Sequence, residues 1–318
     1  MITMTSTAAA KRTTTPSVAA SLLATNIAIG SVSFTLVALS LEELSPLSLA
    51  TGRVVVSALT FAAVVLARPQ LRRPIARGDR LKVFYCGFAG SVAFHVLFQW
   101  GQQRVTVAVA AVTMATYPVL TSLGEVVFLR YRLRARQAAG VICAVVGCVL
   151  IALAGSDAAG AVSLLGVLAI AGASVSWAGV TVITRGLGDR YDSWWLNAPG
   201  TVVGGFAMLA ISAPRLHEFT DLSFQGWLAV VWLGSASSAF IYFSLAKVLT
   251  VISATTTTAI TSVVTPMSIV VAWAVLGQRP SGVELVGAAV VVAGVVLATR
   301  SGGELSGTRS RATVDATA

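Results

Sequence analysis

Residues 107–129 read VAVAAVTMATYPVLTSLGEVVFL, a run of 23 residues with one charged side chain, Glu125. A helix needs about 20 predominantly apolar residues to cross a bilayer, so this stretch is long enough to span a membrane alone. It is too long for a strand of a membrane barrel, and it does not alternate between apolar and polar residues as such a strand does. The stretch predicts a transmembrane helix, and similar runs recur along the chain.

The composition of the whole chain agrees with that class. Of the 318 residues, 11% are charged and 56% are hydrophobic, and the mean hydropathy is +0.85, whereas soluble globular proteins carry about 25% charged residues. The chain lacks the polar side chains that would cover a soluble domain, which excludes a soluble enzyme, a disordered chain and a nucleic-acid-binding module. We predict an all-α integral membrane protein with ten transmembrane helices, at residues 17–39, 47–67, 83–101, 107–129, 138–154, 162–184, 193–212, 226–246, 254–276 and 283–299.

The basic residues predict the orientation of these helices. If the N-terminus is cytoplasmic, 18 of the 22 Lys and Arg residues lie in cytoplasmic segments, and three lie in outer loops. Cytoplasmic loops carry an excess of Lys and Arg, so we expect a multi-pass protein of the plasma (inner) membrane with both termini in the cytoplasm. The net charge of +10 then reflects topology and does not indicate a nucleic-acid partner. The polar tails, residues 1–16 and 300–318, are predicted to be disordered.

The second half of the chain echoes the first at a period near 147 residues. Leu129-Arg130-Tyr131-Arg132, followed by Gly140 and Gly147, matches Leu276-Gly277-Gln278-Arg279, followed by Gly287 and Gly294. Each half, residues 17–154 and 162–299, holds five predicted spans. An odd number of spans makes the second half insert upside down relative to the first, and inverted repeats of this kind are typical of secondary transporters.

A set of landmarks carries a resemblance to a known family. They are Gly30-Ser31, Pro46, Arg53, Pro118, Ser176-Trp177-Ala178 and Arg185 in the first six spans, and Ser253-Ala254, Pro266, Leu276-Gly277-Gln278-Arg279 and Gly287 in the last two. Over about residues 17–300 their order resembles the drug/metabolite transporter superfamily, and more narrowly its ten-helix, two-repeat EamA-type transporters. The resemblance implies export or exchange of small metabolites, amino acids or drugs, driven by a proton gradient or by the substrate's own gradient.

Three ionisable residues lie inside the predicted spans, where such groups are costly and often functional. Glu125 is either a proton-titrating carboxylate or an interfacial partner of Arg130 or Arg132. His95 either takes part in proton coupling or is a core histidine bonded to a neighbouring helix. Arg53 either binds a substrate carboxylate, or extends to the interface, or pairs with Glu42 or Glu43; the family resemblance implies an architectural role for it.

Other polar and aromatic residues are candidates for a substrate cavity near the midplane between the halves. This set comprises Asn26, His95, Gln99, Tyr117, Ser176, Trp177, Tyr242 and Trp273. The alternative for the polar members is hydrogen bonding between helices, and for the aromatic ones contact with lipid. Pro118 and Pro266 interrupt helix hydrogen bonding and are either hinges or static bends.

The sequence therefore predicts a secondary transporter with a small-molecule substrate, which works by alternating access, with export as the expected direction. It contains no HExxH, GxSxG or phosphate-binding loop, so we expect no enzyme activity, no cofactor and no metal site. A membrane channel, or a membrane-embedded enzyme without a recognisable motif, is the alternative. The oligomeric state is left open, with a homodimer as one option.

Overall fold

The computed structural model describes residues 14–129, 135–154, 163–279 and 281–299, and within these ranges it contains helices and no strands. The predicted disordered tails lie outside them, apart from residues 14–16. In the first half the α-helices are α1 (Pro16–Glu43), α2 (Pro46–Ala67), α3 (Arg80–Phe88), α4 (Phe94–Gln102), α5 (Val107–Met114), α6 (Tyr117–Leu129) and α7 (Ala135–Ala154). In the second half they are α8 (Leu164–Leu187), α9 (Ser193–Ile211), α10 (Phe224–Gly234), α11 (Ile241–Val248), α12 (Ala254–Thr261), α13 (Val264–Leu276) and α14 (Gly282–Thr299).

Short helices of other types complete the secondary structure. The 3₁₀ turns are η1 (Pro69–Leu71), η2 (Arg77–Asp79) and η4 (Ala213–Phe219), and the π-helical turns are η3 (Ala89–Ala93) and η5 (Ser235–Phe240). Because η3 and η5 continue directly into their neighbours, α3, η3 and α4 form one continuous stretch, and so do α10, η5 and α11.

Seven helical stretches within the described residues are long and apolar enough to cross a membrane: Pro16–Glu43, Pro46–Ala67, Arg77–Gln102, Val107–Phe128, Leu164–Leu187, Ser193–Ile211 and Phe224–Val248. Val264–Leu276 and Leu285–Gly294 are shorter apolar helices. The fold is therefore that of an all-helical membrane protein, and the count of ten spans stays a prediction.

The distribution of polarity is the reverse of that in a soluble protein. Large apolar side chains such as Phe128 and Phe224 are 78% and 77% exposed, whereas Thr121, Ser244 and Gln99 are fully buried. In water the apolar side chains would be inside. In a bilayer the exposed apolar surface faces lipid, and the polar side chains are kept inside the bundle.

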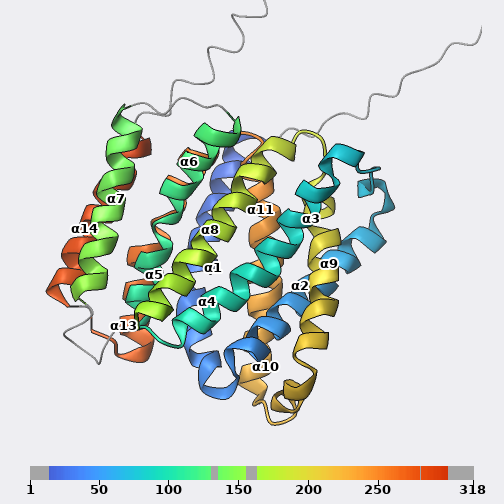
Figure 1. The fold of residues 1–318 in the computed structure, drawn as a ribbon, viewed down its shortest axis with the longest axis horizontal. Coiled ribbons are helices and arrows are strands. Elements are labelled where there is room, and N and C mark those ends of the chain that lie inside the picture. Colours follow the sequence, from blue (N-terminus) through green and yellow to red (C-terminus); the bar gives the residue numbers. More distant parts are fainter. Residues whose placement is uncertain (1–13, 130–134, 155–162, 280, 300–318) are drawn as a thin grey trace, which may run out of the picture.

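The helix boundaries repeat with the period seen in the sequence. The bounds of α5 and α12 differ by 147 residues at both ends, and so do those of α6 and α13. The first residues of α4 and α11, Phe94 and Ile241, differ by the same number. In Figure 1, α4 leads toward the end of the molecule where α1 turns into α2, whereas α10 and α11 lead away from that end. Related stretches of the two halves thus run in opposite directions.

Each half also carries a π-helical turn at a matching place, directly before α4 in one case and directly before α11 in the other. Within the second turn the Ser238 hydroxyl donates to the Leu233 carbonyl, five residues back, at 2.9 Å. π-helical turns occur frequently at functional sites, and both of these lie beside the buried cluster described below.

Close packing of α3 on α9 depends on two glycines. A Cβ atom on Gly200 would lie 2.4 Å from the Phe84 carbonyl oxygen, and one on Gly87 would lie 2.5 Å from the Asn197 carbonyl oxygen. No other residue fits at such distances, because backbone atoms cannot move aside as side chains do. Gly200 belongs to a GxxxG pattern with Gly204, which is typical of close contacts between membrane helices.

Polar contacts join the two halves where the α1–α2 turn meets the α9–α10 connection. The backbone amide and the hydroxyl of Ser223 both donate to the Glu43 carboxylate at 2.9 Å. In return the Ser45 amide donates to the Glu218 carboxylate at 2.8 Å. These reciprocal contacts close this end of the bundle.

A related contact is found at the opposite end. Arg190, after α8, donates to both carboxylate oxygens of Asp79 at 3.0 and 3.2 Å, and the Tyr191 hydroxyl donates to one of them at 2.9 Å. Asp79 directly precedes α3 as Ser223 precedes α10, and Arg190 follows Glu43 by 147 residues. At both ends of the bundle, polar contacts therefore join the end of α1, or the connection after α8, to the residue directly before α10 or α3.

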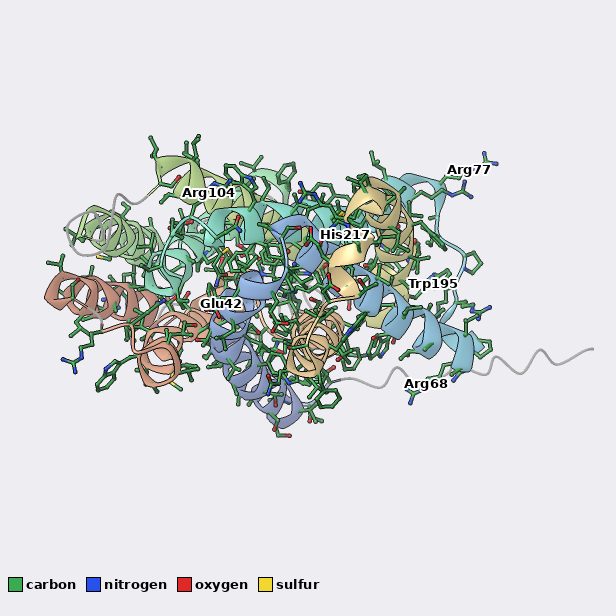
Figure 2. All side chains as sticks on the ribbon, turned by 90° about the horizontal axis from the view of Figure 1, so that it is seen from below. Glu42, Arg68, Arg77, Arg104, Trp195 and His217 are labelled. Atoms are coloured by element: carbon green, nitrogen blue, oxygen red, sulfur yellow. The ribbon has the colours of Figure 1, made fainter. Side chains whose placement is uncertain are left out.

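Charged side chains gather at these ends. Figure 2 is viewed from the end that carries Glu42, Arg104 and His217. Arg68 and Arg77 flank the α2–α3 connection, which also contains Arg72 and Arg73. The end that carries Glu42 and His217 is richer in acidic groups, and the α2–α3 connection is basic. The positive-inside rule concerns the second of these features, the excess of Lys and Arg in one set of connections.

Candidate functional site

A cavity of about 130 Å³ lies between the two halves. Its walls come from α1, α5 and α6 of the first half and from α8, α11, α12 and α13 of the second. The lining residues are Asn26, Gly30, Phe34, Ala111, Met114, Ala115, Tyr117, Trp177, Ile241, Leu245, Thr261, Ser262, Val264 and Thr265. Sites for drug-sized ligands measure about 300–1,000 Å³, so this cavity has room for a small solute.

Polar groups in the cavity wall are paired across the two halves. The Ser244 hydroxyl donates to Asn26 Oδ1 at 2.6 Å, which joins α11 to α1. The hydroxyls of Tyr117 and Thr261 lie 2.8 Å apart, which joins α6 to α12. The lining includes three of the residues that the sequence predicts for the cavity: Asn26, Tyr117 and Trp177.

Aromatic rings form one side of the cavity. The Trp177 ring lies 4.8 Å from that of Tyr242 and 5.2 Å from that of Phe94, measured between centroids. Phe34, which lines the cavity, packs edge-on against Phe98 at 5.4 Å. Tyr242 supports this wall from behind, and its hydroxyl donates to the Gly90 carbonyl in the first π-helical turn.

Behind the wall lies a buried polar cluster, which we call the Arg53 cluster and define as Ser33, Arg53, His95, Gln99, Ser237 and Ser238. Arg53 is 3% exposed, and its guanidinium lies 3.4 Å from the Ser237 hydroxyl and 3.5 Å from that of Ser238. His95 Nε2 lies 3.0 Å from the Ser238 hydroxyl, and the Ser33 and Ser237 hydroxyls are 2.7 Å apart. The cluster thus brings α1, α2, α4 and the second π-helical turn together.

Several polar atoms of this cluster have no hydrogen-bond partner among the described residues. They are Arg53 Nε, His95 Nδ1 and both amide atoms of Gln99. Most buried polar groups in proteins are hydrogen-bonded, so a concentration of unpaired donors and acceptors is unusual. Arg53 neither extends to the interface nor pairs with Glu42 or Glu43, since it is buried and the Glu43 carboxylate is bound by Ser223.

Arg130 and Arg132, the predicted interfacial partners of Glu125, lie outside the described residues. The Glu125 carboxylate accepts hydrogen bonds from the backbone amides of Ala254 and Thr255 at 3.3 and 3.1 Å, and from the Thr255 hydroxyl. These amides are the unpaired donors at the start of α12. Glu125 therefore caps a helix of the second half from α6 of the first half, and it is 4% exposed.

The remaining predicted residues lie near the cavity or away from it. The Ser176 hydroxyl donates to the Ala89 carbonyl at 2.8 Å, beside the first π-helical turn. Trp273 is 54% exposed on α13 and does not line the cavity. Pro118 and Pro266 lie in the first turns of α6 and α13, directly after the breaks that separate these helices from α5 and α12; proline is tolerated at that position of a helix.

Sequence reasoning missed the serines of the cluster. Ser237 and Ser238 belong to the run Gly234-Ser235-Ala236-Ser237-Ser238 in the middle of an apolar stretch. This concentration of small polar residues at mid-span was the signal that could have indicated them. Among the described residues, no group of three or more His, Cys, Asp or Glu side chains is placed to hold a metal ion.

Comparison with known proteins accounts for the repeated architecture. The EamA-like transporter family matches the chain twice, over residues 17–153 and 164–300. The chain belongs to this family. As a member of the EamA-like transporter family it is a membrane transporter rather than an enzyme.

Among the relatives of this EamA-like transporter, a "Probable terminal-alkyne amino-acid exporter" of Streptantibioticus cattleyicolor is 33% identical over 248 residues, which cover 77% of this chain and 82% of the relative. An "Uncharacterized transporter YdfC" of Bacillus subtilis is 26% identical and covers 80% of this chain and 82% of its own length. A crystal structure matches with a TM-score of 0.71 at 20% identity, and the match covers 92% of this chain and 99% of that one. This last likeness shows the fold.

Proposed function

We propose that this protein is a secondary transporter that exports small metabolites, amino acids or drugs across the plasma membrane by alternating access. The observation that carries the proposal is the cavity between the two halves, whose walls come from helices of both. In transporters built from inverted repeats the substrate site lies at such an interface, and access alternates when one part rocks against the other. The name of the relative from Streptantibioticus cattleyicolor, an amino-acid exporter, supports export.

The contacts at the two ends support alternating access. In the described structure one end is held by Glu43 with Ser223, and the other by Asp79 with Arg190. In alternating access, the contacts at one end separate while those at the other end persist. Contacts of both halves at each end are consistent with this motion.

We further propose ten spans in two repeats, at residues 17–154 and 162–299, with both termini in the cytoplasm. The excess of Lys and Arg in the α2–α3 connection supports this orientation. Glu125 and His95 are the proposed sites of proton coupling, because each is a buried titratable group that contacts an element of the other half.

Counterflow in proteoliposomes tests the class of function. Vesicles that contain the purified protein are loaded with unlabelled amino acid and diluted into a trace of labelled amino acid. A carrier produces transient, saturable uptake of label against its gradient, because entry and exit use the same alternating site. Single-channel currents through the protein in a planar bilayer would show that it is a channel and not a carrier.

A further inference from the structure

The Arg53 guanidinium is a charge buried without a counter-charge in the described part of the chain. It is 3% exposed, and among the described residues its side-chain hydrogen bonds go to the serines at 237 and 238, at distances near the upper limit for such bonds. Burying an unpaired charge is costly, and positively charged side chains are rarely buried unless they are paired. A buried guanidinium with these partners is therefore a candidate to bind an anion.

Three carboxylates of the described bundle are held by groups other than Arg53. Glu43 is bound by Ser223, and Glu218 is bound by Ser45. Glu125 accepts three hydrogen bonds from the start of α12. Each of these carboxylates already has partners on another element.

Two unpaired donors of the Arg53 cluster, Arg53 Nε and Gln99 Nε2, suit a carboxylate. A guanidinium presents its donors as a planar fork that fits the two oxygens of a carboxylate. His95 lies on the same face of α4 as Gln99, four residues before it, and its Nε2 donates to the Ser238 hydroxyl, because that hydroxyl gives its own proton to the Leu233 carbonyl. Arg53 is the one buried Lys or Arg among the described residues, so its single charge balances a singly charged anion.

The residues of the Arg53 cluster do not line the central cavity, but the two share helices. On α1, Ser33 of the cluster is followed directly by Phe34, which lines the cavity. Ser237 of the second π-helical turn is followed one turn later, in α11, by Ile241, which also lines it.

We propose that Arg53 and Gln99, with His95 and Ser238 as positioning residues, form the subsite that binds the carboxylate of an amino-acid-type substrate, whose side chain occupies the central cavity. This assignment rests on the proposed transport function and names the substrate class for it. The carboxylate supplies the counter-charge that the described protein lacks.

The test uses a pair of probes that differ only in the group that Arg53 would bind. Counterflow is measured in proteoliposomes with labelled L-propargylglycine, an amino acid with a terminal alkyne, and with L-propargylglycinamide, in which the carboxylate is replaced by a carboxamide. The variants are Arg53→Gln, Arg53→Lys and Ser238→Ala. Arg68→Gln is the matched control, because Arg68 is an exposed arginine at the end of the same helix.

We expect Arg53→Gln to raise KM for the acid about 10- to 100-fold, the loss associated with a charge-assisted hydrogen bond, and to leave transport of the amide within about twofold. Arg53→Lys keeps the charge but not the fork, so it should raise KM for the acid less. Ser238→Ala, a small change that preserves packing, should raise KM for the acid and leave KM for the carboxamide unchanged. A merely structural arginine would impair both probes equally, and that result, or an unchanged KM for the acid, would overturn the proposal.

Failure of the subsite and failure of the transport function can be told apart. If wild-type vesicles show counterflow of neither probe, the proposed transport of amino acids is wrong. The subsite is then judged by the thermal unfolding midpoint of the detergent-purified protein with sodium acetate at constant ionic strength. A rise in the wild type that is absent in Arg53→Gln supports a carboxylate site, no rise contradicts it, and a rise with inorganic phosphate but not with acetate also contradicts it.

Discussion

The backbone amide of Thr255 donates a hydrogen bond to the carboxylate of Glu125 at 3.1 Å, across the boundary between the two halves of the protein. The two residues are 130 positions apart in the chain. A helix start normally obtains its cap from a side chain just before it. Here a neighbouring helix provides the cap, so the position of α12 depends on the position of α6.

Glu125→Ala should destabilise the protein by about 1–3 kcal/mol, because it leaves the buried amides at the start of α12 without an acceptor. Glu125→Gln should cost less, because the amide oxygen still accepts one hydrogen bond. Thermal unfolding of the purified variants measures both. Glu42→Gln, at an exposed position of α1, is the control; equal midpoints for Glu125→Ala and this control would contradict the capping role.

Proton coupling through Glu125 or His95 predicts that Glu125→Gln or His95→Ala loses accumulation driven by a pH gradient. Each variant removes the group that would carry the proton. Counterflow without a gradient requires no net proton movement, so it should persist in Glu125→Gln, and in His95→Ala it should persist for the carboxamide probe, which does not use the Arg53 subsite. The measurement compares the two modes of transport in the same vesicles. If both variants keep full gradient-driven transport, neither residue is the proton site.

Gly200→Ala should prevent the close approach of α9 to α3, because its new methyl group would lie 2.4 Å from a backbone oxygen. Overpacking of this kind costs about 1–3 kcal/mol, and at this position the clash is with backbone. The yield of folded protein and its unfolding midpoint should both fall. Gly172→Ala is the matched control, since its methyl group would only touch Leu97 at 3.4 Å, and it should be tolerated.

The orientation of the bundle predicts opposite labelling of two exposed residues. In a background without Cys86, Cys143 and Cys148, His217→Cys should react with a membrane-impermeant maleimide on intact cells. Arg77→Cys, on the α2–α3 connection, should react only after the membrane is permeabilised. The reverse pattern would show that the basic connection faces outward.

The contacts of Glu218 predict a pH-dependent stability. Burial by itself would raise the pKa of Glu218, but hydrogen bonds from the Ser45 amide and from the Ser45 and Ser48 hydroxyls, together with the charge of Arg215, lower this pKa below its usual value of 4.5. A carboxylate with a lowered pKa stabilises the folded state above its unfolded-state pKa, and this stabilisation is lost as the pH falls through the folded-state pKa.

The measurement is the difference in unfolding midpoint between the wild type and Glu218→Gln as a function of pH. The difference should be constant at neutral pH and should shrink as the pH falls below about 4.5. Asp221→Asn, an exposed neighbour in the same connection, should show a smaller difference. A difference for Glu218→Gln that did not change with pH would refute the electrostatic origin of this contact.

The helices and their repeat could be predicted from the sequence because both depend on local signals. The length of an apolar run determines whether it can span a bilayer, and the period of 147 residues is visible in the chain before any folding. The end of α13 also depends on a local signal. Gly277 follows its last residue and adopts a left-handed conformation with φ of 67°, which glycine allows without strain.

The buried polar cluster could not be predicted in the same way. Arg53, His95 and Ser238 come from three distant parts of the chain, and only the packing of their helices brings them together. Trp273 illustrates a second limit: an apolar helix face that contacts lipid and one that lines a cavity have the same composition, so the pattern alone does not distinguish them.

The two π-helical turns have a consequence for how these helices tolerate length changes. A π turn holds one more residue than the α turn that it replaces, and each residue of a helix turns the following ones by about 100°. Deleting one residue from Ala89–Ala93 would swing His95 away from Ser238, and deleting one from Ser235–Phe240 would swing Tyr242 away from Gly90. A one-residue deletion, which many loops accept, would in either turn separate the cavity wall from the groups behind it.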